Sequence, residues 1–395
     1  MNIVKTPDSD LIFWMRGIRR HLHQYPELAF QEYETAFFIG KKLTGLGIYY
    51  KENIGKTGIV ATIGKQDPNS PCVALRADMD ALPLEEQTGL SFSSRTPGIM
   101  HGCGHDGHVA MLLGAAAMLQ KTSLPGRVVL LFQPAEEGKG GAREMIADGG
   151  LEGVEAIFAG HIDRHFKVNE IGVESGLICA YADEFSIQIQ SKGGHAAKPH
   201  ETADCIVVAG LLVMSLQTLV SREVNPSFPS VVTVGKINGG TAPNAIAAQA
   251  LLQGTIRTTH PNIRETIITG LSRMVKAMEN LYQVETTFAL TEGYPPVINN
   301  PVAAQIAKKA AMDTVGAENV KGLPQPSLGG EDFSFYLKKV PGCLVRFGAR
   351  KEGLGDVPAH SPHFDFDEDV LPVGAQFLAN TALLALERIK ELREA

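Results

Sequence analysis

The 395-residue sequence has little that would mark a nucleic-acid-binding or a disulfide-stabilised protein. It has no excess of basic residues, because 36 Lys and Arg stand against 43 Asp and Glu. The resulting formal charge of −7 does not suit a partner with a phosphate backbone. Its five cysteines are an odd number in a long chain, which is not the pattern of a disulfide framework. We therefore expect neither nucleic acid among its partners nor a set of stabilising disulfides.

Long apolar runs are scarce as well. The longest uncharged stretch, from Cys205 to Ser221, contains polar side chains and falls short of the about 20 apolar residues of a membrane span. We interpret it as a helix packed into a core or a subunit interface. The first ten residues include Lys5, Asp8 and Asp10 with no apolar stretch after a basic one, so no secretory signal is predicted. The expectation is a cytoplasmic protein without membrane contact.

The order of the predicted elements indicates two domains, as does the length at about 150 residues per domain. Up to residue 180, short apolar strands alternate with helices, which is typical of an α/β sheet covered by helices on both faces. Residues 181–292 follow the order β-α-β-β-α-β of a ferredoxin-like module. We predict a catalytic domain made of 1–180 and 293–395, with 181–292 inserted as a smaller α+β domain.

The stretch from His101 to His108, HGCGHDGH, is the most unusual part of the sequence. Cys103 and His105 place a thiol and an imidazole two residues apart, among glycines that let the backbone curl around an ion. A glycine-rich turn with incidental histidines is the alternative. The residue types and their spacing favour a metal site.

Glu136 and Glu137 directly follow the predicted strand 127–132. Adjacent side chains at a strand end point in different directions, so one carboxylate can bind an ion while its neighbour faces the ion's water. This division of labour suits metal-assisted hydrolysis, which needs a ligand that stays ionised and a base that takes a proton. A solvated acidic turn is the alternative.

Further candidate ligands are histidines that follow other predicted strands. Any one of them, taken alone, could be a structural or surface residue. Together they are too many for a four-coordinate structural zinc and suit a site for two metal ions with open positions. The candidates are Cys103, His105, Glu137, His161 and one of His360 and His363.

Asp78 and Asp80 end the predicted strand that starts at Cys72 and face the same way. From there they could hold a ligand histidine by its second ring nitrogen. A helix-cap or loop role is the alternative. A thiol-based enzyme that used Cys103 as nucleophile is a rival interpretation of the whole set, but it would leave Glu136 and Glu137 without a task.

These motifs together resemble the aminoacylase/carboxypeptidase metallohydrolases, and most closely the branch of hippurate hydrolases and plant indole-acetyl-amino-acid amidohydrolases. The similarity runs in order from about residue 15 to 390. The segments that carry it are Arg76–Pro83, His101–His108, Gln133–Gly138, Gly160–His161, Gly193–His200, Ala242–Ile246, Gly254–Arg257 and His360–Pro362.

The resemblance implies a zinc-exopeptidase-like catalytic domain with a mixed sheet, and an inserted lid domain that forms a homodimer or a higher oligomer. It also implies two divalent metal ions per subunit. A cysteine beside histidines favours zinc, with manganese, cobalt and nickel left open. The implied ligands are Cys103, His105, Glu137, His161 and His360.

The resemblance further implies roles in catalysis and substrate binding. Glu136 would be the general base, and His195 would reach the oxyanion of the scissile carbonyl, in several relatives from the partner subunit. Asn244 and Arg257 would grip the amide and carboxylate of a small-molecule substrate. The implied reaction is hydrolysis of the amide bond of N-acyl amino acids. A dipeptidase or carboxypeptidase for small peptides, and a non-catalytic binding protein on the same scaffold, are the alternatives.

Overall fold

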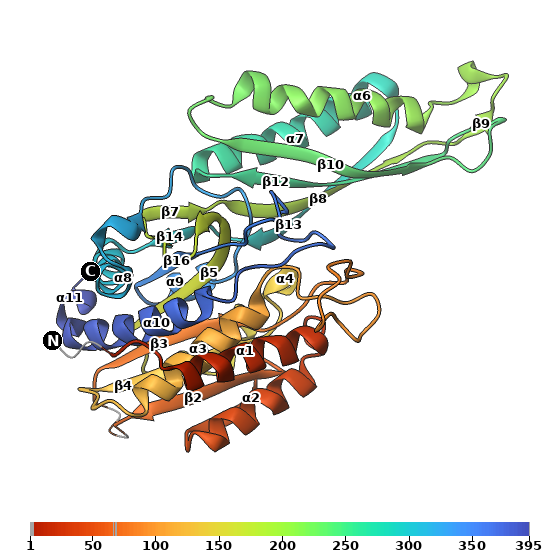
Figure 1. The fold of residues 1–395 in the computed structure, drawn as a ribbon. Coiled ribbons are helices and arrows are strands. Elements are labelled where there is room, and N and C mark those ends of the chain that lie inside the picture. Colours follow the sequence, from red (N-terminus) through yellow and green to blue (C-terminus); the bar gives the residue numbers. More distant parts are fainter. Residues whose placement is uncertain (1–3, 66, 68, 395) are drawn as a thin grey trace. The chain divides into compact units, whose positions relative to one another are not determined.

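The computed structural model describes residues 4–65, 67 and 69–394 (Figure 1). These residues form two compact units. The first unit contains the described chain up to Ile178, then Val297–Gln325, and then the chain from Asp332 onward. The second unit contains Cys179–Pro296 and Pro326–Glu331.

The first unit is built on an eight-stranded mixed sheet. Its strands are β1 (Tyr49–Ile54), β2 (Gly58–Gly64), β3 (Cys72–Asp78), β4 (Arg127–Gln133), β5 (Ala156–Lys167), β6 (Ile171–Gly172), β15 (Val320–Lys321) and β16 (Gly342–Arg350). Their order across the sheet is β1-β2-β4-β3-β5-β16-β6-β15. The central strands β4, β3, β5 and β16 run parallel, whereas β1 and β2 are antiparallel to their neighbours. Two further short strands, β7 (Gly176–Cys179) and β14 (Val297–Asn299), pair with each other.

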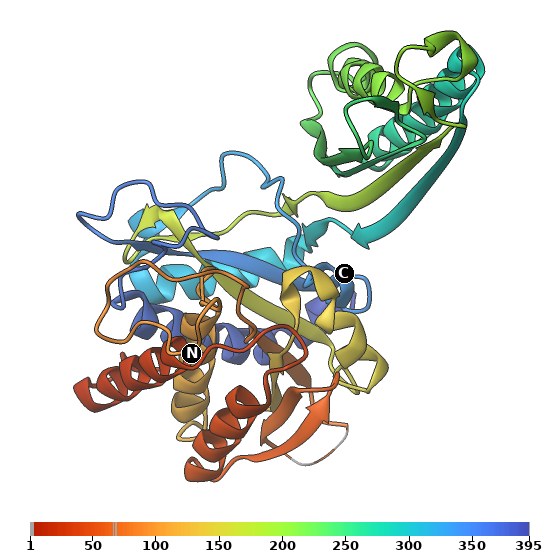
Figure 2. The ribbon, with the colours of Figure 1, turned by 90° about the vertical axis from the view of Figure 1, so that its right-hand side faces the viewer.

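Helices cover both faces of this sheet, which confirms the predicted α/β class (Figure 2). Apolar side chains of β4 on one face join a single large core cluster with α1, α2, α3, α8 and α10, while α5 and α9 contact each other on the opposite face. The helices are α1 (Ser9–Gln24), α2 (Tyr33–Gly45), α3 (His105–Leu119), α4 (Glu136–Lys139), α5 (Gly141–Ala147), α8 (Pro301–Val315), η3 (Ala317–Asn319), α9 (Ser334–Leu337), α10 (Val370–Glu387) and α11 (Ile389–Arg393).

Gly114 allows α1 and α10 to pack closely against α3. A Cβ on Gly114 would come within 2.2 Å of the Met15 sulfur on α1 and 2.9 Å of Ala375 on α10. The glycine therefore lets α1 and α10 pack directly against α3, the helix that begins at His105.

The carboxyl ends of the central parallel strands bring the motifs of the sequence to one edge of the sheet. β3 ends at Asp78 opposite Gln133, the last residue of β4, and β5 passes through His161 beside Arg346 of β16. Loops that follow such strand ends commonly carry the active site of open α/β sheets. The order of the strands alone therefore brings the candidate ligands to the same edge of the sheet.

The second unit has the ferredoxin-like arrangement that the sequence predicts. Along the chain it contains β8 (Tyr181–Gln190), β9 (Gly194–His195), η1 (Pro199–Glu201), α6 (Cys205–Thr218), η2 (Leu219–Glu223), β10 (Ser230–Gly239), β11 (Ala245–Ile246), β12 (Gln249–Thr258), α7 (Pro261–Tyr282) and β13 (Glu285–Tyr294). The antiparallel sheet has the order β10-β12-β8-β13, so the first and third strands of the β-α-β-β-α-β unit lie in the centre. Residues 326–331 belong to this unit because Ser327 pairs with the chain at Cys179–Ala180.

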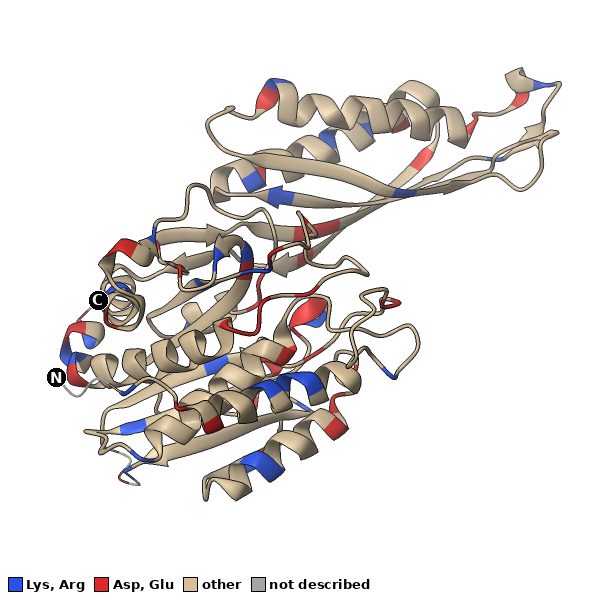
Figure 3. Ribbon diagram, viewed as in Figure 1, with Lys and Arg blue, Asp and Glu red and all other residues tan. Residues whose placement is uncertain are grey.

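Among the described residues, two helical stretches are long and apolar enough to cross a membrane, Cys205–Glu223 and Val370–Glu387. The second is a core helix, because 83% of it is buried inside the structure. The first is only 33% buried. Figure 3 shows α6 and α10 almost without charged residues. Ile206, Val207 and Met214 of α6 are at least half exposed, so this helix has an apolar outer face.

Candidate metal centre and active site

The loop before α3 places Cys103 against His161. Gly104 has a φ of 95°, a left-handed conformation in which glycine has no steric penalty, and it caps the start of α3. The Cys103 Sγ lies 3.4 Å from Nε2 of His161. The other ring nitrogen of His161, Nδ1, donates to the carbonyl oxygen of Ile162 at 2.7 Å. The ring is therefore oriented so that Nε2 faces the thiol.

His105 is held by Asp80. Its Nδ1 donates to the Asp80 backbone oxygen at 3.0 Å and lies 3.2 Å from Oδ1 of the same residue. Its Nε2 is buried and has no hydrogen-bond partner among the described residues. A histidine fixed at one nitrogen by a carboxylate or carbonyl, with the other nitrogen left over, is the usual arrangement of a metal-ligating histidine.

A strained loop presents Glu136 and Glu137. Ala135 lies in the left-handed region, at φ 54° and ψ 42°, and Gly138 follows at φ 78°. The Glu137 N–H donates to Oδ2 of Asp80 at 2.9 Å, so one carboxylate orients both His105 and Glu137. The Oε1 atom of Glu137 is buried without a hydrogen-bond partner in the described chain, although it lies 3.2 Å from Nε2 of His360. His360 itself has a φ of 67°, a second non-glycine residue in a disfavoured conformation at this site.

The candidate ligand atoms form two overlapping groups. Those of Cys103, His105 and His161 lie within 4.8 Å of one another, as do those of Cys103, Glu137 and His360. The groups share Cys103 and together include the five residues that the family resemblance names as ligands. Sulfur, imidazole nitrogen and carboxylate oxygen are the donors that zinc, cobalt and nickel accept. With the buried Nε2 of His105, which has no hydrogen-bond partner among the described residues, this donor set fits a metal centre.

The electrostatics also suit a bound cation. Burial raises the pKa of the Cys103 thiol to about 12, so the sulfur becomes a thiolate only when a cation displaces its proton. Burial, aided by His108 and Arg346, holds the pKa of His161 well below its usual value, which keeps a lone pair available. Burial alone would raise the pKa of Glu137, but His360 and His105 lower it and keep the carboxylate ionised.

Asp78 holds His108 by a hydrogen bond and also lies beside His105, with its Oδ2 3.7 Å from Nε2 of that ring. Its Oδ1 accepts from Nδ1 of His108 at 2.6 Å, and its Oδ2 accepts from Arg76 at 2.6 Å. The Ile162 N–H donates to Nε2 of His108 at 2.8 Å, so both ring nitrogens of His108 are engaged. Burial would raise the pKa of Asp78, but His105, Arg76 and His108 hold it well below its usual range. The sequence did not single out His108 or Arg76 for this positioning role.

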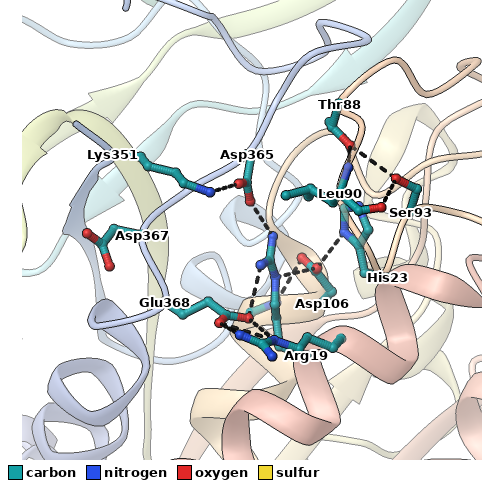
Figure 4. A network of polar contacts seen from close by, with 12 residues as sticks. Arg19, His23, Thr88, Leu90, Ser93, Asp106, Lys351, Asp365, Asp367 and Glu368 are labelled. Atoms are coloured by element: carbon teal, nitrogen blue, oxygen red, sulfur yellow. Dashed lines mark hydrogen bonds and ion pairs between the residues drawn. The ribbon is translucent and has the colours of Figure 1, made fainter. Parts of the chain in front are cut away.

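Arg19 links three segments around the site (Figure 4). Its side chain is almost fully buried and contacts Asp106 at 3.1 Å, Asp365 at 2.7 Å and Glu368 at 3.1 Å. Asp106 follows the candidate ligand His105, and Asp365 lies five residues after His360. α1 thereby ties the loop at the start of α3 to the segment after His360. No local pattern in the sequence reveals this contact, because Arg19 lies 87 residues from Asp106 and 349 residues from Glu368.

The second unit carries the remaining candidates at two separate places. His195 on β9 is exposed, and its strand pairs with β11, which starts beside Asn244. The Ala196 N–H donates to the Asn244 carbonyl oxygen at 3.1 Å, so these two residues are neighbours. Arg257 lies near the end of β12, opposite Ala182, whereas β11 lies just before the start of β12 at Gln249. From Gln249 to Arg257 the strand advances by eight residue-to-residue steps, or roughly 26 Å. The unit therefore does not bring Arg257 to His195.

Comparisons with known proteins agree with this geometry. Residues 74–384 match the model of peptidase family M20/M25/M40. The N-acetyl-L-cysteine deacetylase of Bacillus subtilis (strain 168) is 40% identical over 381 residues, which cover 95% of this chain and 89% of that protein. The IAA-amino acid hydrolase ILR1-like 4 of Arabidopsis thaliana is 39% identical over 391 residues, which cover 97% and 88%.

A solved structure shows the same fold. It is the YXEP protein of Bacillus subtilis, described as a dinuclear metal-binding peptidase of family M20. It matches with a TM-score of 0.82 and 34% identity, over 96% of this chain and 99% of that one. The resemblance drawn from the motifs and the expected class, a metal-dependent hydrolase acting on amide bonds, are thereby confirmed. The chain belongs to peptidase family M20/M25/M40.

Proposed function

We propose that the protein hydrolyses the amide bond of N-acyl amino acids, with Glu136 as general base. The observation that carries the proposal is the pair of ligand groups sharing Cys103, with Glu136 close by: its carboxylate lies within 4.8 Å of the donor atoms of His105 and Glu137. We assign two ions per subunit to Cys103, His105, Glu137, His161 and His360, and zinc as the metal because a thiol is among the donors. The five free cysteines suit the reducing cytoplasm.

When bound, the ions polarise the amide carbonyl and make water acidic enough to lose a proton near neutral pH. Glu136 takes that proton and delivers it to the leaving nitrogen. Glu136 is only 7% exposed, so bulk water does not compete for its proton. The imidazole of His195 stabilises the negative charge that develops on the carbonyl oxygen. The guanidinium of Arg257 binds the substrate carboxylate through two parallel hydrogen bonds, and Asn244 contacts the amide.

We further propose that the active enzyme is a homodimer in which His195 comes from the partner copy. Arg257 lies near the end of β12, whereas His195 pairs with Ala245 of β11, which precedes the start of β12 at Gln249. We infer that they are too far apart for one small substrate to touch both within one second unit. α6 offers an apolar outer face for a second copy, with Met214 72% exposed. It packs beside β10, the edge strand of its sheet, which can also pair with another chain.

A hydrolysis screen with metal analysis tests the reaction. The purified protein is assayed with N-acetyl, N-benzoyl and N-indoleacetyl amino acids and with dipeptides, and its metal content is measured. We expect turnover of an N-acyl amino acid and a much slower reaction of the same compound with its carboxylate blocked as an amide. Preference for dipeptides would support the dipeptidase alternative. Full metal occupancy without turnover of any substrate would favour a binding protein.

Subunit complementation tests the dimer. Neither His195→Ala nor Glu136→Gln alone should turn over substrate at the normal rate. After the two variants are mixed and allowed to exchange subunits, we expect up to about a quarter of the wild-type activity to return, because half of the dimers are mixed and each has one intact site. Met214→Lys should shift the mass in solution towards the monomer, whereas Gln305→Lys on the exposed face of α8 should not. Activity in a strictly monomeric protein would refute the shared site.

A further inference from the structure

Glu32 is a completely buried carboxylate that no step of the proposed reaction uses. It lies just before α2, outside the residues 74–384 that match the family model. Its side chain makes no capping hydrogen bond to α2, so a helix cap does not explain it. Instead, Oε1 accepts the Ala135 N–H at 2.9 Å and Oε2 accepts the Thr57 hydroxyl at 2.6 Å.

Ala135 needs an external partner for its backbone. A left-handed φ of 54° is disfavoured for a residue with a Cβ, and Ala135 adopts it immediately before the general base. The segment that follows is not a regular helix, because Glu137 has a ψ of 81°. The backbone therefore departs from helical geometry on both sides of Glu136, at Ala135 and at Glu137.

The backbone N–H groups of the residues before and after Glu136 both donate to carboxylates. Glu32 accepts the N–H of Ala135, and Asp80 accepts the N–H of Glu137 at 2.9 Å. The loop is also packed closely against the residue after Thr57, since a Cβ on Gly58 would lie 2.8 Å from the ring of Pro134. Glu32 thus links Thr57 to Ala135 by hydrogen bonds, and the residue after Thr57 packs against Pro134.

We propose that Glu32 is a positioning residue for Glu136: it anchors the Ala135 N–H, fixes the left-handed bend, and so aims the Glu136 carboxylate at the reacting water. The proposal deepens the function above and rests on Glu136 being the base. Without this anchor the Ala135 N–H is buried and unpaired, and the bend relaxes. A shift of about 1 Å in a catalytic group costs on the order of 100-fold in rate.

Two substitutions of Glu32 with side chains of similar size test the hydrogen bond to the Ala135 N–H separately from the packing of the side chain. Glu32→Gln keeps an oxygen that accepts the Ala135 N–H, whereas Glu32→Leu fills the same space without an acceptor. We expect Glu32→Leu to lower kcat by about 30-fold to 100-fold with KM and metal content within twofold of the wild type. Glu32→Gln should stay within about threefold in kcat. Thr57→Val, which breaks only the other contact of Glu32, serves as the structural control and should also keep kcat within about threefold.

Hydrogen exchange read by mass spectrometry gives a second readout that needs neither substrate nor metal. In the wild type and in Glu32→Gln, a peptide covering residues 133–138 should be protected. In Glu32→Leu, exchange in this peptide should rise at least tenfold while peptides from α10 remain unchanged. If Glu32→Leu does not fold, Glu32→Met, which has an unbranched apolar side chain, replaces it in both measurements.

Wild-type kcat and unchanged exchange in the apolar variant would overturn the proposal, and so would an equal loss of kcat in Glu32→Gln and Glu32→Leu. Failure of the proposed function gives a different result. In that case neither the wild type nor any variant hydrolyses N-acyl amino acids. Hydrogen exchange of residues 133–138 still reports whether Glu32 anchors the loop.

Discussion

The two units hold their candidate residues in different ways. In the first unit, Cys103 and His105 are buried, and each is oriented by contacts from other segments of the chain. In the second unit, His195 and Asn244 are exposed and are tied only through the short β9–β11 pair and its flanking backbone. The first arrangement is preorganised for bond-breaking chemistry. The second leaves both residues open to solvent.

Replacing the base should produce the largest effect, because it removes chemistry from the preorganised unit. Glu136→Gln should lower kcat by about 1,000-fold or more and leave metal content and the unfolding temperature unchanged, since the carboxylate accepts a proton but is not among the assigned ligands. Glu137→Gln is the matched control and should lose metal as well as activity. Turnover by Glu136→Gln within tenfold of the wild type would show that the first unit is not organised around this base.

Replacing the exposed His195 should lower kcat nearly as much as replacing Glu136 and should leave the stability of the protein unchanged. His195→Ala should lower kcat by about 100-fold to 1,000-fold, the usual cost of losing one group that stabilises the developing oxyanion. Thermal unfolding and metal analysis should match the wild type, because the side chain is exposed and makes its one side-chain hydrogen bond to the nearby Ala197 N–H. A fall in the unfolding temperature of several degrees would instead give His195 a structural role.

Arg257 should act on binding alone. Arg257→Ala should raise KM about 10-fold to 100-fold for substrates with a free carboxylate and leave kcat within about threefold. A substrate whose carboxylate is blocked should show the same KM with both proteins, which makes it the control. An equal rise in KM for both substrates would place Arg257 outside the carboxylate site.

The smallest effect concerns the stability of the first unit as pH changes. Burial, together with nearby Asp80, raises the pKa of Glu32 from 4.5 to about 7. The folded state therefore keeps a proton that the unfolded chain has lost, and the free energy of unfolding falls as pH rises through 7. Glu32→Gln cannot ionise. Between pH 6 and pH 8 the metal-free wild type should lose about 1 kcal/mol relative to Glu32→Gln, measured by urea unfolding. Parallel curves for the two proteins would contradict a raised pKa.

Much of the fold was predictable because it depends on local patterns. The alternation of apolar strands and helices, and the β-α-β-β-α-β order of residues 181–292, are periodicities that neighbouring residues carry. Candidate ligands were also visible, since Cys103 and His105 stand in a glycine-rich motif and Glu137 and His161 follow strands. The position of Pro326–Glu331 was not visible, because it depends on pairing across a separation of about 150 residues.

The positioning residues were hidden for a related reason. Arg19, Glu32 and His108 contact partners that lie far from them in the sequence. Nothing next to Arg19 or Glu32 sets them apart from ordinary helix residues, and His108 stands in the unusual 101–108 stretch without any local sign that it positions Ile162 and Asp78. Asp80 could be named as a possible partner of a ligand histidine, yet its simultaneous contact with Glu137 required the three-dimensional structure. Local chemistry was therefore easier to predict than the contacts that orient it.

The place of β16 in the sheet has a consequence for how the protein is made. β16 is the last strand to be synthesised, yet it lies inside the sheet between β5 and β6, and His360 follows it ten residues after its end. A growing chain cannot complete the sheet or the ligand set until nearly all of it has been translated. Such long-range pairing is slow to form. Metal uptake would then be a late event in biogenesis, and a chain truncated before β16 would carry an exposed strand edge and an incomplete metal centre.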